Sequence, residues 1–184
     1  MGWEIELLGK YFTGDALLLL SGHGRAVADL ALAVCRVQGL AEADCRFVEE
    51  AALLHDIGVC RIHAPKLGLF GAHPYIMHGI IGREILEHEG FSLHALVCER
   101  HIGVGLTIDD IKNQNLPLPL RDMLPISRAE HIICFSDLFF SKNPGKIFLQ
   151  KSPEQVRKKL AGFGESKLQI FDRWMMDFGA ALIR

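Results

Sequence analysis

The sequence lacks the cysteine pattern of a disulfide framework or of a structural zinc cluster. Its cysteines are odd in number and no two are separated by two residues; they are Cys35, Cys45, Cys60, Cys98 and Cys134. Cysteines without such spacing are typical of small, buried apolar side chains in a reducing compartment. We therefore expect all of them to be reduced and none to hold a metal.

The sequence also lacks a long hydrophobic run and a basic N-terminus. The apolar run over residues 16–20 is far shorter than the roughly 20 residues of a transmembrane helix. Residues 1–6 carry glutamates where a signal peptide would carry basic residues. These features predict a soluble, cytoplasmic protein that binds no membrane.

Basic residues are not in excess, since the net charge is −2. A nucleic-acid partner held by bulk electrostatics is therefore not expected. A small polyanionic substrate stays open, because a metal site can supply local positive charge that composition does not show. A homo-oligomer is equally compatible with the sequence.

Alternating strand patterns and internal repeats are absent, and helical periodicity runs through most of the chain. The fold is therefore predicted to be all-α, and 184 residues suit one domain. We expect helices over residues 3–11, 15–38, 42–55, 74–89, 92–101 and 127–140. Two more should follow a capping box at residues 152–155, with core anchors at Leu168, Phe171, Trp174 and Phe178.

Two segments interrupt the helices and are predicted to form rims around a site: residues 59–72, which hold a proline and two glycines, and residues 106–126, which hold three prolines. Gly79 and Gly82 lie inside a predicted helix, where glycine is unfavourable. Either they permit close packing against a neighbouring helix, or they leave room for a metal centre.

The most informative feature is His55-Asp56, at the end of an apolar helix. Alone, the pair is explained by a histidine at the negative end of a helix dipole. Four further residues support a metal site, because each falls in a different predicted helical segment. They are His23, His78, His101 and Asp137. A helical bundle can bring such side chains into a shared interior.

Four histidines and two aspartates form a mixed nitrogen and oxygen set. This set suits Fe, Mn, Co, Ni or Zn better than Ca. A single ion surrounded by six side chains would have no open position for water or substrate. Two metals are therefore more plausible than one.

The pattern resembles the HD superfamily of metal-dependent phosphohydrolases, whose signature is a His, a His-Asp pair and a distant Asp. The matching residues are His23, His55-Asp56 and Asp137, with the His-Asp-Ile-Gly variant at 55–58. His78 and His101 match two further histidines of the binuclear branches. The resemblance is greatest to a group of short, stand-alone, uncharacterised HD hydrolases. It implies an HD-type helical bundle spanning residues 1–184, with a core over 15–142 and C-terminal helices over 153–180 packed on it.

The resemblance also implies the roles of these residues. His23, His55, Asp56 and Asp137 would hold one metal, and Asp56 would bridge to a second metal held by His78 and His101. Asp56 with a metal-bound hydroxide would then be catalytic, hydrolysing a phosphomonoester or phosphodiester of a nucleotide or another small phosphate compound. The implied cofactors are two divalent transition metal ions, iron or manganese first, with nickel, cobalt, zinc or magnesium as further candidates.

Two departures bear on the substrate. Val59 follows the motif where some phosphodiesterase members have lysine, and no Gly-Tyr-Pro element follows His101, so a cyclic dinucleotide is disfavoured. Candidate phosphate-binding residues are Arg61, Lys66, Arg100 and Arg128, and candidate groups for leaving-group protonation are His63 and His73. Glu99 and Glu130 are candidates to orient a ligating imidazole. Arg157, Lys158 and Lys159 are expected to form a solvated face and are given no function.

Two other functions are compatible with these ligands. An HD-type di-iron oxygenase would use the same side chains. A non-catalytic metal-binding signalling module is less favoured, because such domains usually lack part of the ligand set and all six positions are filled here.

Overall fold

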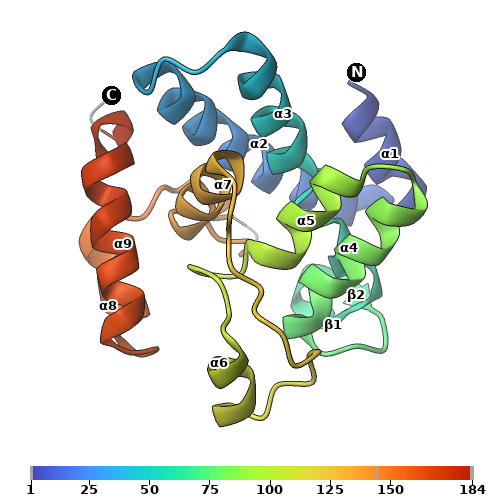
Figure 1. The fold of residues 1–184 in the computed structure, drawn as a ribbon. Helices are drawn as coiled ribbons and strands as arrows, with labels where there is room; N and C mark the ends of the chain where they lie inside the picture. Colours follow the sequence, from blue (N-terminus) through green and yellow to red (C-terminus); the bar gives the residue numbers. More distant parts are fainter. Residues whose placement is uncertain (1, 144, 183–184) are drawn as a thin grey trace.

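The computed structural model describes residues 2–143 and 145–182, without the side chain of Lys66. Helices dominate, and the predicted all-α class is confirmed (Figure 1). The α-helices of this part of the chain are α1 (Trp3–Tyr11), α2 (Gly14–Val37), α3 (Glu42–Leu54), α4 (His78–His88), α5 (Ser92–Arg100), α6 (Ile108–Asn113), α7 (Arg128–Leu138), α8 (Pro153–Ala161) and α9 (Glu165–Phe178). Short 3-10 turns add η1 (Ile57–Arg61), η2 (Pro65–Leu67), η3 (Tyr75–Met77) and η4 (Gly179–Leu182).

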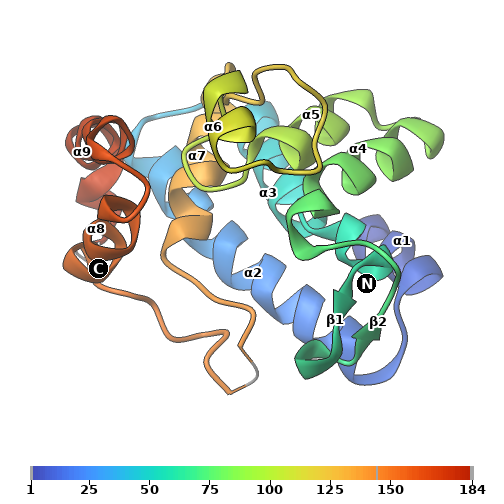
Figure 2. The same cartoon turned by 90° about the horizontal axis from the view of Figure 1, so that it is seen from below.

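Helix α2 crosses the molecule and packs against α3 and α7 (Figure 2). By length and composition alone it could cross a membrane, but 56% of its most apolar window is buried inside the protein. Buried small residues such as Ala28 and Ala31 let its neighbours approach closely. Helix α2 thus serves as the central core helix, and His23 lies on its buried side.

The segment around Pro74 differs from the prediction. Pro74 has extended backbone angles and precedes the turn η3, so α4 begins at His78 rather than at residue 74. A proline disfavours helical angles in the residue before it but not in itself, so the sequence permitted a helix that starts at Pro74. The 3-10 turn between Pro74 and α4 left no signal in the sequence. His78 therefore lies at the start of a helix and not in its second turn.

The first predicted rim, 59–72, is more ordered than expected. It contains η1, η2 and a short antiparallel hairpin of β1 (His63–Ala64) and β2 (Leu69–Phe70). Ile62 and Leu69 are buried in a core cluster that also includes residues of α1, α4 and α5. Strands of two residues leave no alternating pattern to detect, which explains why the sequence predicted only a loop.

The glycines of α4 allow close helix packing. A Cβ at position 79 would lie 2.8 Å from the carbonyl oxygen of Cys98, and one at position 82 would lie 3.0 Å from the Cβ of Cys98. Both positions face α5, the helix that follows α4. The packing explanation for Gly79 and Gly82 is therefore supported.

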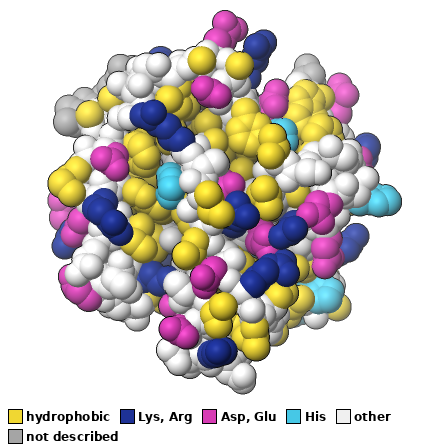
Figure 3. All heavy atoms as spheres, viewed as in Figure 1, with side chains coloured by type: hydrophobic (Ala, Val, Ile, Leu, Met, Phe, Trp, Pro, Cys, Tyr) yellow, Lys and Arg dark blue, Asp and Glu magenta, His cyan; other side chains and the backbone are white. Residues whose placement is uncertain are grey.

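The C-terminal helices complete a second core cluster around α7. Phe171, Trp174 and Phe178 are buried there, while Leu168 is half-buried. The ring centroids of Phe135 and Phe178 lie 5.5 Å apart in an edge-to-face arrangement. On the face shown in Figure 3, hydrophobic side chains lie in small groups among charges of both signs.

Candidate metal centre

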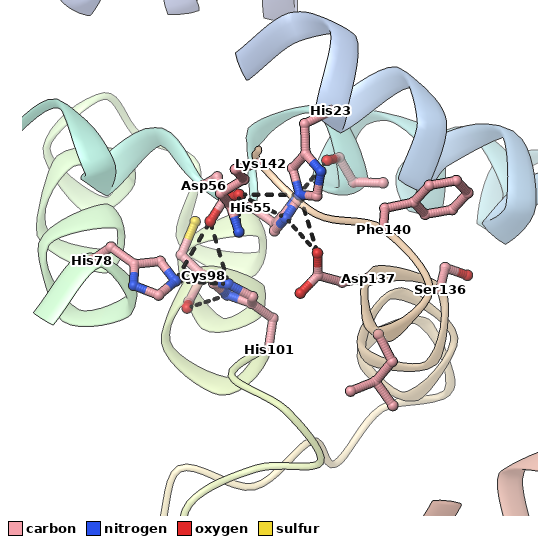
Figure 4. A network of polar contacts seen from close by, with 12 residues as sticks. His23, His55, Asp56, His78, Cys98, His101, Ser136, Asp137, Phe140 and Lys142 are labelled. Atoms are coloured by element: carbon pink, nitrogen blue, oxygen red, sulfur yellow. Dashed lines mark hydrogen bonds and ion pairs between the residues drawn. The ribbon is translucent and has the colours of Figure 1, made fainter. Parts of the chain in front are cut away.

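The six predicted ligands converge at one place inside the bundle (Figure 4). His55 and Asp56 directly follow α3, and His101 directly follows α5. His23 lies in α2, His78 begins α4 and Asp137 is in the last turn of α7. Asp137 is half-buried and the other five are buried.

Asp56 lies between two groups of histidines. Its Oδ2 is 3.3 Å from His23 Nε2 and 3.1 Å from His55 Nε2. Its Oδ1 is 3.5 Å from the Nε2 atoms of both His78 and His101. One carboxylate therefore presents one oxygen to each group, which is the arrangement expected of a bridging ligand.

Asp137 completes the first group. Its Oδ1 lies 3.1 Å from His23 Nε2 and 3.6 Å from His55 Nε2. Ligand atoms held about 2.1 Å from one ion in tetrahedral or octahedral geometry are roughly 3.0–3.4 Å apart. The separations within both groups are close to that range, so the set fits divalent transition metals.

Three of the imidazoles are oriented by their own backbone. The Nδ1–H groups of His55, His78 and His101 donate to the carbonyl oxygens three residues earlier, at 2.6, 2.6 and 2.8 Å. Because a carbonyl can only accept, the neutral form of each imidazole carries its proton on Nδ1 and its lone pair on Nε2. Each Nε2 then faces the centre as a metal donor, as in established metal sites.

Several polar atoms of the centre are buried without a hydrogen-bond partner among the described residues. They are both ring nitrogens of His23, Nε2 of His55 and both carboxylate oxygens of Asp56, of which Oδ2 has an ion pair with Lys142. Buried polar atoms left without partners are costly, and a bound metal ion would satisfy all of them except His23 Nδ1. This observation, together with the donor types, shows that the residues fit a metal centre.

Electrostatics keep the oxygen ligands ionised. Burial alone would raise the pKa of Asp56, but the charges of His55 and Lys142 hold it well below its usual value. Burial alone would lower the pKa of His55, but the carboxylates of Asp56 and Asp137 raise it to about 10. Burial dominates at His78 and lowers its pKa to about 3, against the charge of Asp56.

Lys142 is a residue of the centre that sequence reasoning missed. Its Nζ lies 2.8 Å from Asp56 Oδ2 and 5.8 Å from the ring centroid of Tyr75. The carboxylates of Asp56 and Asp137 raise the pKa of this largely buried ammonium well above its usual value, although burial opposes them. The only signal in the sequence was a lysine five residues after Asp137, next to an apolar run.

A cavity of about 470 Å³ opens onto the centre. His78, His101 and Asp137 form part of its wall, so the proposed ligands are accessible from it. The part of the chain after α7 contributes three lysines to the wall, which are Lys142, Lys151 and Lys159. The cavity therefore combines ligand side chains with positive charge that could hold an anion.

None of the predicted substrate-binding residues whose side chains are described lines this cavity. Arg61 and His63 are exposed in the first rim, and His73 is exposed directly after it. Arg100 pairs with Glu130 at 3.0 Å, and Arg128 donates to Gln38 at 2.5 Å. The side chain of Lys66, in η2, lies outside the described part of the structure.

The two predicted orienting carboxylates contact arginines instead of imidazoles. Glu99 accepts from Arg83 and from Arg121, whose Nη2 lies 2.5 Å from Glu99 Oε1. Glu130 accepts from Arg100 and from the backbone N–H of Ile126 at 2.6 Å. Backbone carbonyls have the orienting role that was expected of these glutamates. The glutamates instead link α5 to α4 and to α7, and link both α5 and α7 to the second rim, residues 106–126.

The family model described as HD domain matches residues 20–139, which contain all six converging residues. The chain belongs to the HD domain family. This is a family of metal-dependent hydrolases, and the match ends within two residues of Asp137. The predicted family is confirmed, whereas the roles of the individual site residues stay predictions.

Curated relatives of this HD domain protein include an uncharacterized protein of Methanocaldococcus jannaschii, 40% identical over 97 residues, or 52% of this chain and 50% of the relative. A tRNA (cytidine(56)-2'-O)-methyltransferase of Thermoplasma volcanium is 30% identical over 156 residues, or 84% of this chain and 40% of that protein. The chain thus spans half or less of the length of these relatives. Their names do not refer to hydrolysis of a phosphate ester. No solved structure gives a significant match.

Proposed function

We propose that this protein is a metal-dependent phosphohydrolase acting on a phosphomonoester or phosphodiester of a nucleotide or another small phosphate compound. The observation that carries the proposal is the position of Asp56 between two groups of histidines, next to a cavity whose wall includes His78, His101 and Asp137 and also presents lysines. His23, His55, Asp56 and Asp137 would hold one divalent ion. Asp56, His78 and His101 would hold a second.

Bound divalent ions would act as Lewis acids that activate water and offset charge on the phosphoryl group. The side chains of this protein then have three tasks. The imidazoles of His55, His78 and His101 keep their donor atoms fixed. Asp56 and Asp137 stay ionised, and Lys142 offers an ammonium to a phosphoryl oxygen. Fixed positive charge at the place where negative charge develops lowers the activation barrier.

The methyl transfer in the names of two relatives is not proposed for this chain. The matched region covers 40% of one of these proteins and 30% of the other. A name that describes a whole protein is no guide to a segment of that length. The family match, in contrast, covers the converging residues themselves.

Two measurements on purified protein loaded with Mn²⁺ or Fe²⁺ test the proposal. One is release of phosphate or nucleoside monophosphate from a panel of phosphate esters, and the other is metal content by elemental analysis. Asp56→Ala should remove bound metal and lower turnover by at least about 1,000-fold, because both ion positions lose a donor. The matched control is Asp29→Ala on α2, whose side chain is exposed and remote from the cavity.

Inactivity across all metals and esters would overturn the proposal. Substrate-dependent O₂ consumption with a mixed-valent iron signal would indicate the di-iron oxygenase instead. Equal activity in anaerobic Mn²⁺ protein would exclude that oxygenase. Full metal content without any turnover would favour the non-catalytic module.

A further inference from the structure

A second cavity of about 180 Å³ lies beside the cavity of the metal centre. Ile102, Gly103, Leu138 and Lys159 line both cavities, so the two are neighbouring parts of one cleft. The second part, here called the apolar cleft, has no predicted metal ligand in its wall. Its chemistry therefore differs from that of the centre, although the two parts adjoin.

The wall of the apolar cleft comes from segments that are distant in sequence. Ile76 comes from η3, Leu106 and Leu116 flank α6, and Leu160 belongs to α8. Ile76, Leu106 and Leu116 are only half-buried, so they present apolar surface to the opening. Such surface next to a polar reaction centre is typical of a subsite for the non-reacting part of a ligand.

Phe163 stands at the edge of the apolar cleft with 55% of its surface exposed. Its backbone N–H donates to the carbonyl oxygen of Leu160 at 2.9 Å, which fixes the turn after α8. An exposed aromatic ring at the mouth of an apolar cleft offers a face for stacking. A planar aromatic group gains most from such a contact.

The polar groups at this end can recognise the edge of an aromatic heterocycle. The amide of Gln114, exposed at the opening, can both donate and accept. Lys167 is committed elsewhere, because its Nζ donates to Gly105 O at 2.9 Å and to Asp110 Oδ2 at 2.5 Å. These bonds join α9 to the floor of the cleft and keep its shape.

Lys159 lies where the two cavities meet. It is exposed and belongs to α8, beyond the residues matched by the family model. A ligand that reached from the centre into the apolar cleft would pass this ammonium. Negative charge at the phosphate end of such a ligand would be favoured there.

We propose that the apolar cleft is a subsite for the base of a nucleotide, with Phe163 as its stacking residue and Lys159 as its phosphate-facing residue. The proposal rests on the function proposed above, and it narrows the substrate from any small phosphate ester to a nucleotide. Phe163 and Lys159, which would select a nucleotide over other phosphate esters, lie in the C-terminal segment, outside the region matched by the family model.

Equilibrium binding to the full chain loaded with Mn²⁺, measured by calorimetry, tests this inference without turnover. The probes are the four common nucleoside monophosphates, each compared with ribose 5-phosphate, which keeps the sugar and phosphate but lacks the base. At least one nucleotide should bind about tenfold or more tightly than ribose 5-phosphate. Phe163→Ala should remove at least about fivefold of that preference, as expected for one lost stack, and leave ribose 5-phosphate unchanged.

Lys159→Ala should weaken both classes of probe by a similar factor. The matched controls are Lys158→Ala, at an exposed residue of α8 that lines neither cavity, and Phe70→Ala, at an exposed aromatic residue of β2. Both should bind like the unmodified protein. Circular dichroism and metal content of each variant show whether folding is intact.

Equal affinity for nucleotides and ribose 5-phosphate, or no binding of any nucleotide, would overturn the subsite. So would a Phe163→Ala variant that keeps the full preference. Base preference without hydrolysis of any ester would retain the subsite and refute the hydrolase. Hydrolysis without base preference would do the reverse.

Discussion

Two segments leave the metal centre directly after predicted ligands, and they behave differently. Residues 59–72 come after His55-Asp56, and none of their side chains that the structure describes lines the cavity of the centre. Residues 141–163 follow Asp137 and return to the cleft with three lysines and Phe163. Proximity in sequence to a predicted ligand therefore does not predict proximity to the cavity.

The cause in the first segment is Gly58. A Cβ at this position would overlap the carbonyl oxygen of His78 and the backbone nitrogen of Gly82. The chain after Asp56 is therefore pressed against the backbone of α4. It then continues into a hairpin whose Ile62 and Leu69 are buried in the core with α1.

The second segment is tied back by Lys151. Its backbone N–H donates to Phe139 O at 2.8 Å, and its Nζ donates to Leu138 O at 3.0 Å. These bonds hold the chain across the end of α7, where helix carbonyls lack partners within the helix. The segment that follows then reaches the cleft through α8.

The largest effect is expected at Gly58. Gly58→Ala should lower the free energy of unfolding by about 3 kcal/mol, because backbone atoms of α4 must move to admit the new Cβ. Urea denaturation measures this loss. Gly9→Ala is the control, because a Cβ added at position 9 of α1 would meet open space. The stability of this variant should be unchanged or slightly higher. A stable Gly58→Ala protein would refute the steric account of the first segment.

Lys142→Met should have the next largest effect. Metal content should persist, while kcat falls about 100-fold, the usual result of removing one electrostatic contact to the reacting group. Steady-state kinetics on the substrate found by the ester panel measure it, with Lys146→Met as the exposed control from the same segment. Unchanged kcat would reduce Lys142 to a structural counter-ion of Asp56.

Lys151→Met should cost about 1 kcal/mol of stability, because the carbonyl groups at the end of α7 lose the ammonium that donates to them. Thermal unfolding measures the loss, and Lys158→Met, which has an exposed side chain on α8, should match the unmodified protein. Equal stability of the two variants would contradict the tie described for the second segment.

The smallest effect is expected in the first segment. Arg61→Ala and His63→Ala should change kcat/KM by less than about twofold and stability by less than about 0.5 kcal/mol, since both side chains are exposed and remote from the cavity. The same kinetic assay applies. A tenfold loss in either variant would return the first segment to the substrate site and remove the contrast between the two segments.

The features that could be predicted from the sequence were those that depend on helical periodicity and on the spacing of the candidate ligands. The limits of α1 and the six converging residues were expected from sequence, as was Ser152 capping α8. Lys142 and Lys159 were not, because neither spacing nor residue type distinguishes a lysine at a cavity from one in solvent. Their positions depend on the path of the chain after α7, which long-range contacts such as those of Lys151 determine.

Pro74 and Glu99 show the same limit. Each was assigned a role from local sequence alone, the first as a helix start and the second as a partner of His101. The real partner of His101 is a carbonyl of its own helix, which no side-chain pattern reveals. Backbone contacts of this kind become visible only in the folded chain.

Three helices, α3, α5 and α7, end at the metal centre. The C-terminus of each helix carries a partial negative charge of about half a unit, so the backbone adds its own negative field to the two carboxylates. That field attracts cations and repels phosphate. The ends of three helices would therefore stabilise a bound metal ion together with the two carboxylates, while the lysines of the cavity wall supply the positive charge that an anion would meet.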